Sequence, residues 1–319
     1  MSLLLGLVLL IGGGEVLVRG AVGLAERLGV SPLLVGLTVV ALGTSAPELA
    51  VSVQAALAGS PGIAIGNIVG SNIANILVIL GLSALVFPVA VASRALKRDG
   101  MVMLATAAGY AALAAAWGLD RIVGVLLLLS AVAYLTLTVR AERLSATDHG
   151  AVFDKAAAFE EAGPGRLHRL RGVVKPLLFL VAGLVLIVFG GRLLVQGAVA
   201  LAQGLGVSEE VIGLTIVAVG TSLPELVTSV IAAIRRHADV ALGNVIGSNI
   251  LNILVIGGVT STIAPVVVAP QMLWLDMPVM VAVTVLCLVF ARSGWRIGRR
   301  EGGLMLALYA AYVAVLLAI

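Results

Sequence analysis

Two short segments place a glutamate directly after a proline inside an apolar stretch: residues 43–48 read GTSAPE and residues 220–225 read GTSLPE. Proline has no amide hydrogen, and its ring strikes the carbonyl one turn back, so each proline leaves backbone carbonyl oxygens without helical partners. Each segment therefore offers a hard cation carboxylate, carbonyl and hydroxyl oxygens. The expected ligands are Glu48, Thr44 and Ser45 in the first segment, and Glu225, Thr221 and Ser222 in the second.

A stripe of neutral oxygen donors follows each of these segments. Asn67, Ser71 and Asn75 recur every four residues, which puts them on one face of a helix. The second copy has Asn244, Ser248 and Asn252. Polar stripes also form hydrogen bonds between membrane helices. Because both stripes follow a Pro-Glu segment, we expect them to contribute cation ligands, while a purely structural role stays open for Asn67 and Asn244.

The composition indicates that these residues lie in a membrane protein. Of the 319 residues, 61% are hydrophobic and 11% are charged, and the mean hydropathy is +1.18. A water-soluble globule cannot bury that much apolar surface. The chain holds roughly ten runs of about 20 mostly apolar residues, each long enough to cross ~30 Å of hydrocarbon. A carboxylate at mid-membrane costs at least ~2.5 kcal/mol, and a bound cation offsets that cost.

The sequence repeats itself. Shifting it by 177 positions aligns residues 13–81 with 190–258 without a gap, and 41 of these 69 positions are identical. Five spans precede the second copy, and an odd number of spans inverts that copy across the membrane. We therefore predict an all-α polytopic fold with about ten transmembrane helices in two inverted five-helix repeats. The expected parts are a first repeat at 1–140, a cytoplasmic linker loop at 141–172 and a second repeat at 173–319.

The charged residues follow membrane topology. Despite a net charge of +4, the basic residues gather in alternate connections, so we attribute them to orientation and expect no nucleic-acid partner. The termini are predicted outside and the linker loop in the cytoplasm, for a multi-pass protein of the inner (plasma) membrane.

Glu15 and Arg19, one turn apart in the first span, are expected to pair. The single Cys287 and the histidines of connecting segments exclude a thiolate or histidine metal site within the membrane.

At the two repeated motifs the sequence resembles the cation/calcium antiporter superfamily, specifically the prokaryotic type of its sodium-calcium exchanger branch. The patterns GTSxPE and GNxxGSNxxN occur in full twice, at matching offsets. The resemblance implies that Glu48 and Glu225 bind Ca2+ and Na+ in turn, and that Thr44 and Thr221 supply backbone oxygens. It implies further Na+ positions completed by Ser45, Ser71, Asn75, Ser222, Ser248 and Asn252.

The predicted function is a secondary antiporter that exchanges Na+ for Ca2+ by alternating access, as a monomer in the lipid bilayer and without a cofactor. The resemblance implies a third Na+ per cycle, hence electrogenic transport. The position of Asn252 is often occupied by an acidic residue in relatives that require K+, so the neutral asparagine here favours K+ independence.

A Ca2+/H+ antiporter is the nearest alternative, but its motif usually begins GN rather than GTS. A cation channel is weaker because such pores are usually oligomeric. An enzyme is not expected, because no histidine or lysine in the membrane could activate a serine.

Overall fold

The computed structural model describes residues 2–91, 96–146, 166–204, 218–265 and 268–318. The first half of the chain contains the long helices α1 (Ser2–Leu28), α4 (Ala46–Leu57), α5 (Pro61–Ala74), α8 (Met101–Ala116) and α9 (Arg121–Ala146). Shorter segments extend them, with η marking a π-helix: α2 (Pro32–Val35), η1 (Gly36–Val40), α3 (Ala41–Thr44), η2 (Asn75–Leu80), α6 (Gly81–Val86) and η3 (Leu96–Gly100).

The second half repeats this order. Its long helices are α11 (Arg166–Gly204), α14 (Leu223–Ile234), α15 (Ala238–Leu251), α17 (Met277–Arg292) and α18 (Arg299–Ala318). Its shorter segments are α13 (Ala218–Thr221), η5 (Asn252–Gly257), α16 (Gly258–Ile263) and η6 (Met272–Asp276). A two-residue antiparallel ladder joins the halves, pairing β1 (Val89–Ala90) with β2 (Arg296–Ile297).

The predicted membrane fold is confirmed. Within the described ranges, eight helices are long and apolar enough to cross a bilayer, and the bent pair Pro32–Thr44 and Ala46–Leu57 makes a ninth. The shorter apolar helix Leu223–Ile234 accounts for the one remaining span of the ten that were predicted. Residues 205–217, which come before it, lie outside the described ranges. The chain is a helical protein of two inverted repeats. Helices α9 and α11 extend into the predicted linker from either side, and the repeat boundaries at 140 and 173 stay a prediction.

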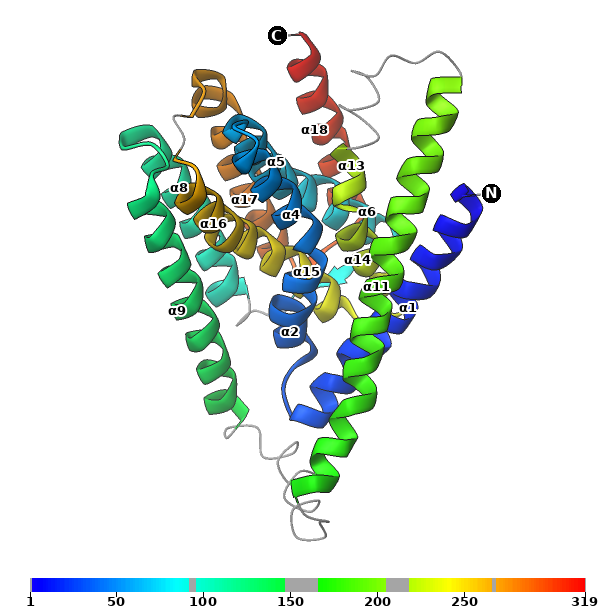
Figure 1. The fold of residues 1–319 in the computed structure, drawn as a ribbon. Helices are drawn as coiled ribbons and strands as arrows, with labels where there is room; N and C mark the ends of the chain where they lie inside the picture. The colour runs from blue at the N-terminus through cyan, green and yellow to red at the C-terminus, as the bar shows by residue number, and fades with distance from the viewer. Residues whose placement is uncertain (1, 92–95, 147–165, 205–217, 266–267, 319) are drawn as a thin grey trace.

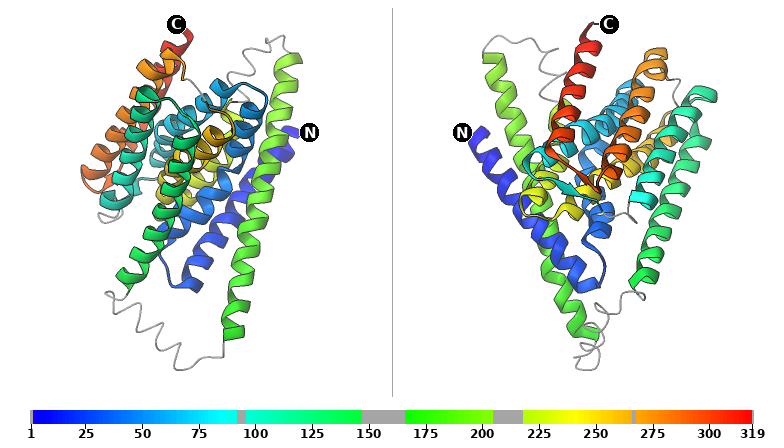
Figure 2. Two further views of the ribbon diagram at one scale, coloured as in Figure 1. Left: turned by 60° about the vertical axis from the view of Figure 1, so that its left-hand side comes forward. Right: turned by 180° about the vertical axis from the view of Figure 1, so that it is seen from behind.

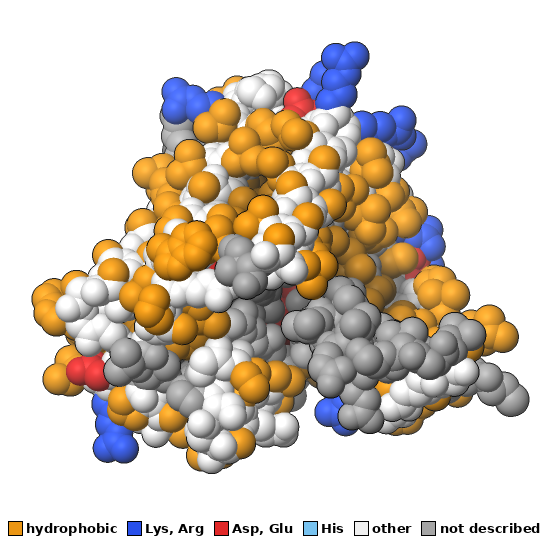
Figure 3. All heavy atoms as spheres, turned by 90° about the horizontal axis from the view of Figure 1, so that it is seen from above, with side chains coloured by type: hydrophobic (Ala, Val, Ile, Leu, Met, Phe, Trp, Pro, Cys, Tyr) orange, Lys and Arg blue, Asp and Glu red, His pale blue; other side chains and the backbone are white. Residues whose placement is uncertain are grey.

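Burial differs sharply between the spans. In the apolar 18-residue stretch of each span, the buried share is 94% for Ala238–Ile263 and 72% for Gly62–Val86. The corresponding share for Arg299–Ala318 is 11%. The two most buried spans carry the predicted Asn-Ser-Asn stripes, so the protein's centre is built around polar side chains. Large apolar side chains such as Leu129 and Val132 are exposed on the outer helices. Viewed from one end, hydrophobic side chains spread over the surface, and Lys and Arg gather at its margin (Figure 3). This inside-out distribution fits a lipid environment.

Helices α1 and α11 form a pair beside the remaining helices (Figures 1 and 2). Glycines bring their backbones into contact: a Cβ on Gly183 would lie 2.5 Å from the amide nitrogen of Leu17, and one on Gly20 would lie 2.6 Å from that of Leu180. No larger residue fits at such a close approach. The sequence therefore makes the α1–α11 contact tight, and the pair packs as one body.

Candidate cation site

The Pro-Glu segment of the first repeat breaks its span as predicted. Helix α3 ends at Thr44, and α4 begins at Ala46 with Pro47 in its first turn. The two parts of the span, Pro32–Thr44 and Ala46–Leu57, are bent by 43° relative to each other. The broken span begins after Ser31, whose hydroxyl caps the helix by accepting a hydrogen bond from the Leu34 amide at 3.2 Å.

The second repeat breaks at the equivalent position. Helix α13 ends at Thr221, α14 begins at Leu223, and Ser222 between them has nearly the backbone angles of Ser45. Residues 205–217, which precede this break, lie outside the described ranges. The same break thus occurs twice, once in each orientation across the membrane.

The two breaks meet, and each repeat completes the other's carboxylate. The Ser45 hydroxyl donates to Oε1 of Glu225 at 2.9 Å, and the Ser222 hydroxyl donates to Oε1 of Glu48 at 3.1 Å. Both glutamates are 1% exposed, and each contacts the serine at the break of the opposite repeat. Two buried carboxylates at the meeting point of the breaks need positive charge to compensate them.

Several buried oxygens around these carboxylates have no hydrogen-bond partner within the described part of the chain. They are the second carboxylate oxygens of Glu48 and Glu225, the amide oxygens of Asn75 and Asn252, and the hydroxyl of Ser248. Buried polar groups are otherwise almost always satisfied. Carboxylate, amide and hydroxyl oxygens suit Na+ and Ca2+. Ser71 and Thr44 are also buried, so nine of the ten predicted ligands lie in the protein interior, and Thr221 is half-buried.

Sequence reasoning did not anticipate the π-helices. Asn75 begins η2 and Asn252 begins η5, at equivalent positions of the two repeats. π-Helical turns are rare and frequently accompany functional sites, because the extra residue in the turn shifts the side chains that follow it. The stripe predicted from α-helical spacing is therefore regular only as far as each terminal asparagine.

The buried polar groups around the two glutamates carry oxygen donors. Among the described residues, no three His, Cys, Asp or Glu side chains come together as a metal cluster. Cys287 is a buried free thiol in α17. The centre is thus one of hard oxygen donors, with two carboxylates and otherwise neutral groups.

Comparison with known proteins agrees with this geometry. The model of the family described as sodium/calcium exchanger protein matches residues 1–140 and 175–318, which include both breaks and both stripes. The chain belongs to the sodium/calcium exchanger family. The sodium/calcium exchanger MaX1 of Methanosarcina acetivorans is 38% identical, with 98% of this chain and 97% of MaX1 covered. The proposed antiporter CaxA of Alkalimonas amylolytica is 41% identical over 97% of this chain and 95% of its own.

A solved structure has the same fold. The sodium-calcium exchanger NCX_Mj, in a form soaked with Na+, superposes with a TM-score of 0.84 at 36% identity, covering 98% of this chain and 97% of NCX_Mj. The described arrangement is therefore that of a family of ion exchangers.

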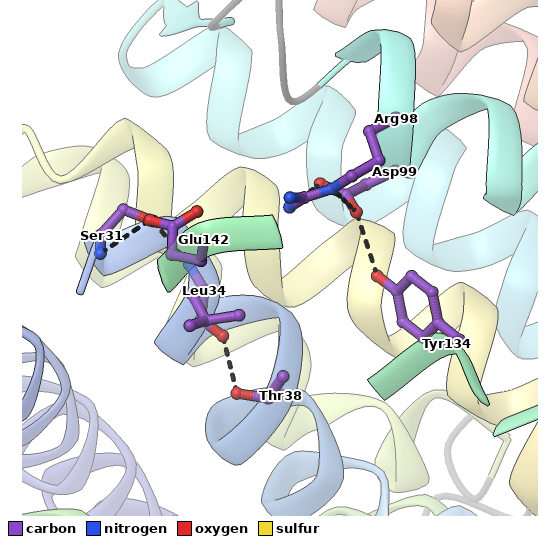
Figure 4. Close-up of polar contacts among 7 residues, drawn as sticks. All are labelled: Ser31, Leu34, Thr38, Arg98, Asp99, Tyr134 and Glu142. Atoms are coloured by element: carbon purple, nitrogen blue, oxygen red, sulfur yellow. Dashed lines mark hydrogen bonds and ion pairs between the residues drawn. The ribbon is translucent and has the colours of Figure 1, made fainter. Parts of the chain in front are cut away.

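In this family member, charged residues outside the site support its helices from one side. The Glu142 carboxylate of α9 accepts a hydrogen bond from the Ser31 amide at 3.0 Å, at the start of the span that carries Glu48 (Figure 4). Next to it, Arg98 pairs with the buried Asp99 at 2.9 Å, and the Tyr134 hydroxyl of α9 donates to Asp99 at 3.5 Å. Helix α9 thus anchors the beginning of the broken span.

The intramembrane pair predicted on the first span is also present, with an additional partner. Arg19 contacts Glu15 at 2.7 Å, which confirms the prediction, and Arg235 contacts the other oxygen of Glu15 at 2.6 Å. Because Arg235 follows α14, this second contact joins the α1–α11 pair to the helix that carries Glu225. The sequence offered no signal for it, since the two residues are 220 positions apart.

Proposed function

We propose that this protein exchanges Na+ for Ca2+ across the cell membrane and that both ions bind in turn between Glu48 and Glu225. The observation that carries the proposal is the pair of buried carboxylates, each hydrogen-bonded by a serine of the opposite repeat. Two carboxylates balance one Ca2+ or two Na+ equally well. Mutually exclusive occupancy of one site is a physical basis for counter-transport.

The ligands in this proposal are the oxygen groups that the two breaks and the two stripes bring together. They are Glu48, Glu225, Thr44, Thr221, Ser45, Ser222, Ser71, Ser248, Asn75 and Asn252. The partnerless oxygens of Asn75, Asn252 and Ser248 support their assignment as neutral ligands. With only two charged ligands, the site needs no K+ to offset a further carboxylate. We therefore propose K+-independent exchange, and a third Na+ per cycle would make it electrogenic.

We also propose that the protein works as a monomer, because both glutamates belong to one chain. The basic connections face the cytoplasm, which leaves the termini outside and residues 141–172 as the cytoplasmic linker between repeats 1–140 and 173–319. Alternating access would come from the α1–α11 pair sliding over the other helices, exposing the site to one side and then the other.

The test is Ca2+ uptake into proteoliposomes that contain the purified protein. Vesicles loaded with Na+ should accumulate Ca2+ when diluted into Na+-free buffer, with a rate that saturates in Ca2+ and is unaffected by K+. Uptake driven by a pH gradient but not by a Na+ gradient would replace the proposal with Ca2+/H+ antiport. Non-saturating Ca2+ flux without counter-transport would indicate a channel.

A further inference from the structure

The two asparagines that open the polar stripes, Asn67 and Asn244, have a different environment from the two that close them. The amide nitrogen of Asn244 lies 3.3 Å from the backbone carbonyl oxygen of Glu225 and 3.0 Å from the hydroxyl of Ser229. Its amide oxygen accepts a hydrogen bond from the Thr44 hydroxyl at 3.1 Å. Asn244 is fully buried, and both its nitrogen and its oxygen are engaged.

The first repeat contains the same donor arrangement. The amide nitrogen of Asn67 lies 3.2 Å from the backbone carbonyl oxygen of Glu48 and 2.9 Å from the hydroxyl of Ser52. Ser52 and Ser229 are both fully buried and occupy equivalent positions of the two repeats. An amide group has two N–H donors, and each asparagine directs them to one carbonyl and one hydroxyl. The recurrence in both repeats makes an incidental contact an inadequate explanation.

We infer that Asn67 and Asn244 are positioning residues, which hold the backbone of the two glutamates in place and do not bind the transported ion. This inference rests on the proposed exchange site and assigns a role to side chains outside its ligand set. The N–H groups of an amide repel a cation, and in Asn244 the oxygen that could attract one already accepts a hydrogen bond from Thr44, which directs it toward the first repeat's break. Asn75 and Asn252, by contrast, have amide groups with no hydrogen-bond partner among the residues that the structure describes, and they are suited to ligation.

Asn244 also connects the two breaks. Thr44 ends α3 in the first repeat, and the Thr44–Asn244 bond leads directly to the backbone of Glu225 in the second. The next residue, Ser45, reaches the carboxylate of the same glutamate. Residues 44 and 45 therefore hold Glu225 at two points, one on its backbone and one on its side chain. This double attachment sets the distance between the two breaks, and Ca2+ binding depends on that distance because its ligands must lie at about 2.3–2.6 Å.

The test is a double-mutant cycle between Asn244→Ala and Thr44→Val, with Na+-driven Ca2+ uptake and the thermal stability of the ion-free protein as readouts. Valine removes the Thr44 hydroxyl and keeps its backbone carbonyl. We expect Asn244→Ala to raise the KM for Ca2+ roughly tenfold, because the Glu225 backbone is then no longer held at the position that Ca2+ ligation needs. The maximal rate should fall much less. Adding Thr44→Val should then change KM by less than about twofold, because their shared bond is already lost.

The matched control is Thr38→Val, because the Thr38 hydroxyl donates to the Leu34 carbonyl of its own helix at 2.7 Å. In the double variant with Asn244→Ala, the fold-change in KM caused by Thr38→Val should multiply with that caused by Asn244→Ala. The positioning role is overturned if the fold-change caused by Thr44→Val multiplies in the same way. It is also overturned if Asn244→Ala lowers stability and leaves KM unchanged. Should Asn244→Ala fail to fold, Asn67→Ala and Ser229→Ala must show the same rise in KM. Uptake by the wild type distinguishes failure of the proposed function from failure of the positioning role. If the wild type shows no Na+-driven Ca2+ uptake, the proposed function fails. If the wild type is active and Asn244→Ala has the wild-type KM, only the positioning role is refuted.

Discussion

The two repeats agree closely where they approach the proposed ion site and differ where they meet the rest of the protein. Ser45 and Ser222 reach across to opposite glutamates at similar distances, and Asn75 and Asn252 each begin a π-helix. Away from the site, Glu15 of the first repeat corresponds to Arg192 of the second. A site that must accept ions from either side gains from symmetry, whereas contacts outside the site carry no such requirement.

A second pair of carboxylates shows the same contrast. Asp99 and Asp276 lie 177 positions apart, and each accepts a hydrogen bond from a tyrosine on a later helix, at 3.5 Å from Tyr134 and 2.7 Å from Tyr312. Arg98 pairs with Asp99, but a leucine precedes Asp276. The architecture is thus duplicated more faithfully than the charges around it. Mutations at equivalent positions therefore report directly on where symmetry matters.

The largest expected effect is loss of either site glutamate. Glu48→Gln and Glu225→Gln should each reduce Na+-driven Ca2+ uptake roughly 100-fold or more, because one carboxylate leaves a buried divalent ion poorly compensated at a cost of several kcal/mol. The two variants should be equally impaired and should elute from a sizing column as the wild type does. Glu26→Gln, an exposed glutamate on α1, serves as the control. Normal exchange by either site variant would remove that glutamate from the site.

Crosslinking should separate the α1–α11 pair from the other helices. In a Cys287→Ser background, Gly14→Cys with Val227→Cys would join α1 to α14, because a Cβ on Gly14 would lie 2.9 Å from the Val227 side chain. Oxidation of this pair should arrest turnover and leave equilibrium Ca2+ binding intact. The control pair, Gly23→Cys with Pro176→Cys, joins α1 to α11, where a Cβ on Gly23 would lie 3.7 Å from the Pro176 Cβ. This crosslink should preserve transport, since these helices are expected to move together. Full turnover with a verified α1–α14 crosslink would show that these helices do not slide.

The serine variants measure the cross-repeat hydrogen bonds. Ser45→Ala and Ser222→Ala each remove a donor to a carboxylate, a contact that contributes about 1.5–3 kcal/mol. We expect each to raise the KM for Ca2+ by about tenfold or more, with similar values for the two. Ser130→Ala, whose hydroxyl bonds only to its own helix, should leave KM unchanged. A large difference between Ser45→Ala and Ser222→Ala would mean that the two carboxylates contribute unequally.

The smallest effect is expected where the repeats differ. Glu15→Gln weakens the contacts to Arg19 and Arg235, which join α1 to the end of α14. Partly exposed pairs contribute about 0.3–1 kcal/mol, so the maximal exchange rate should change by about two- to fivefold. The KM for Ca2+ should stay constant, since Glu15 does not contact the site. Arg192→Gln, at the equivalent position, is the comparison, and a shift in KM for Glu15→Gln would argue that α1 contributes to ion binding.

Much of this arrangement is predictable from local chemistry. The breaks at Pro47 and Pro224 follow from the missing amide hydrogen of proline, and the start of the first broken span follows from the capping serine at Ser31. The repeat predicts that every feature found once will occur twice. The π-helices at Asn75 and Asn252 were not predictable, because an extra residue in a helical turn is stabilised by packing against neighbouring helices rather than by local preference.

By itself, the sequence determined the membrane fold, its duplication and the oxygen-bearing residues of the centre, because hydropathy, residue type and spacing are local properties. Only the tertiary structure decided which groups bond to one another. It directs Ser45 to Glu225 rather than to the nearby Glu48. It engages Asn244 with Thr44, whereas the amide of Asn252 has no hydrogen-bond partner within the described ranges. These choices depend on how helices far apart in the chain pack across the pseudo-two-fold axis, and spacing along one helix carries no information about its neighbour.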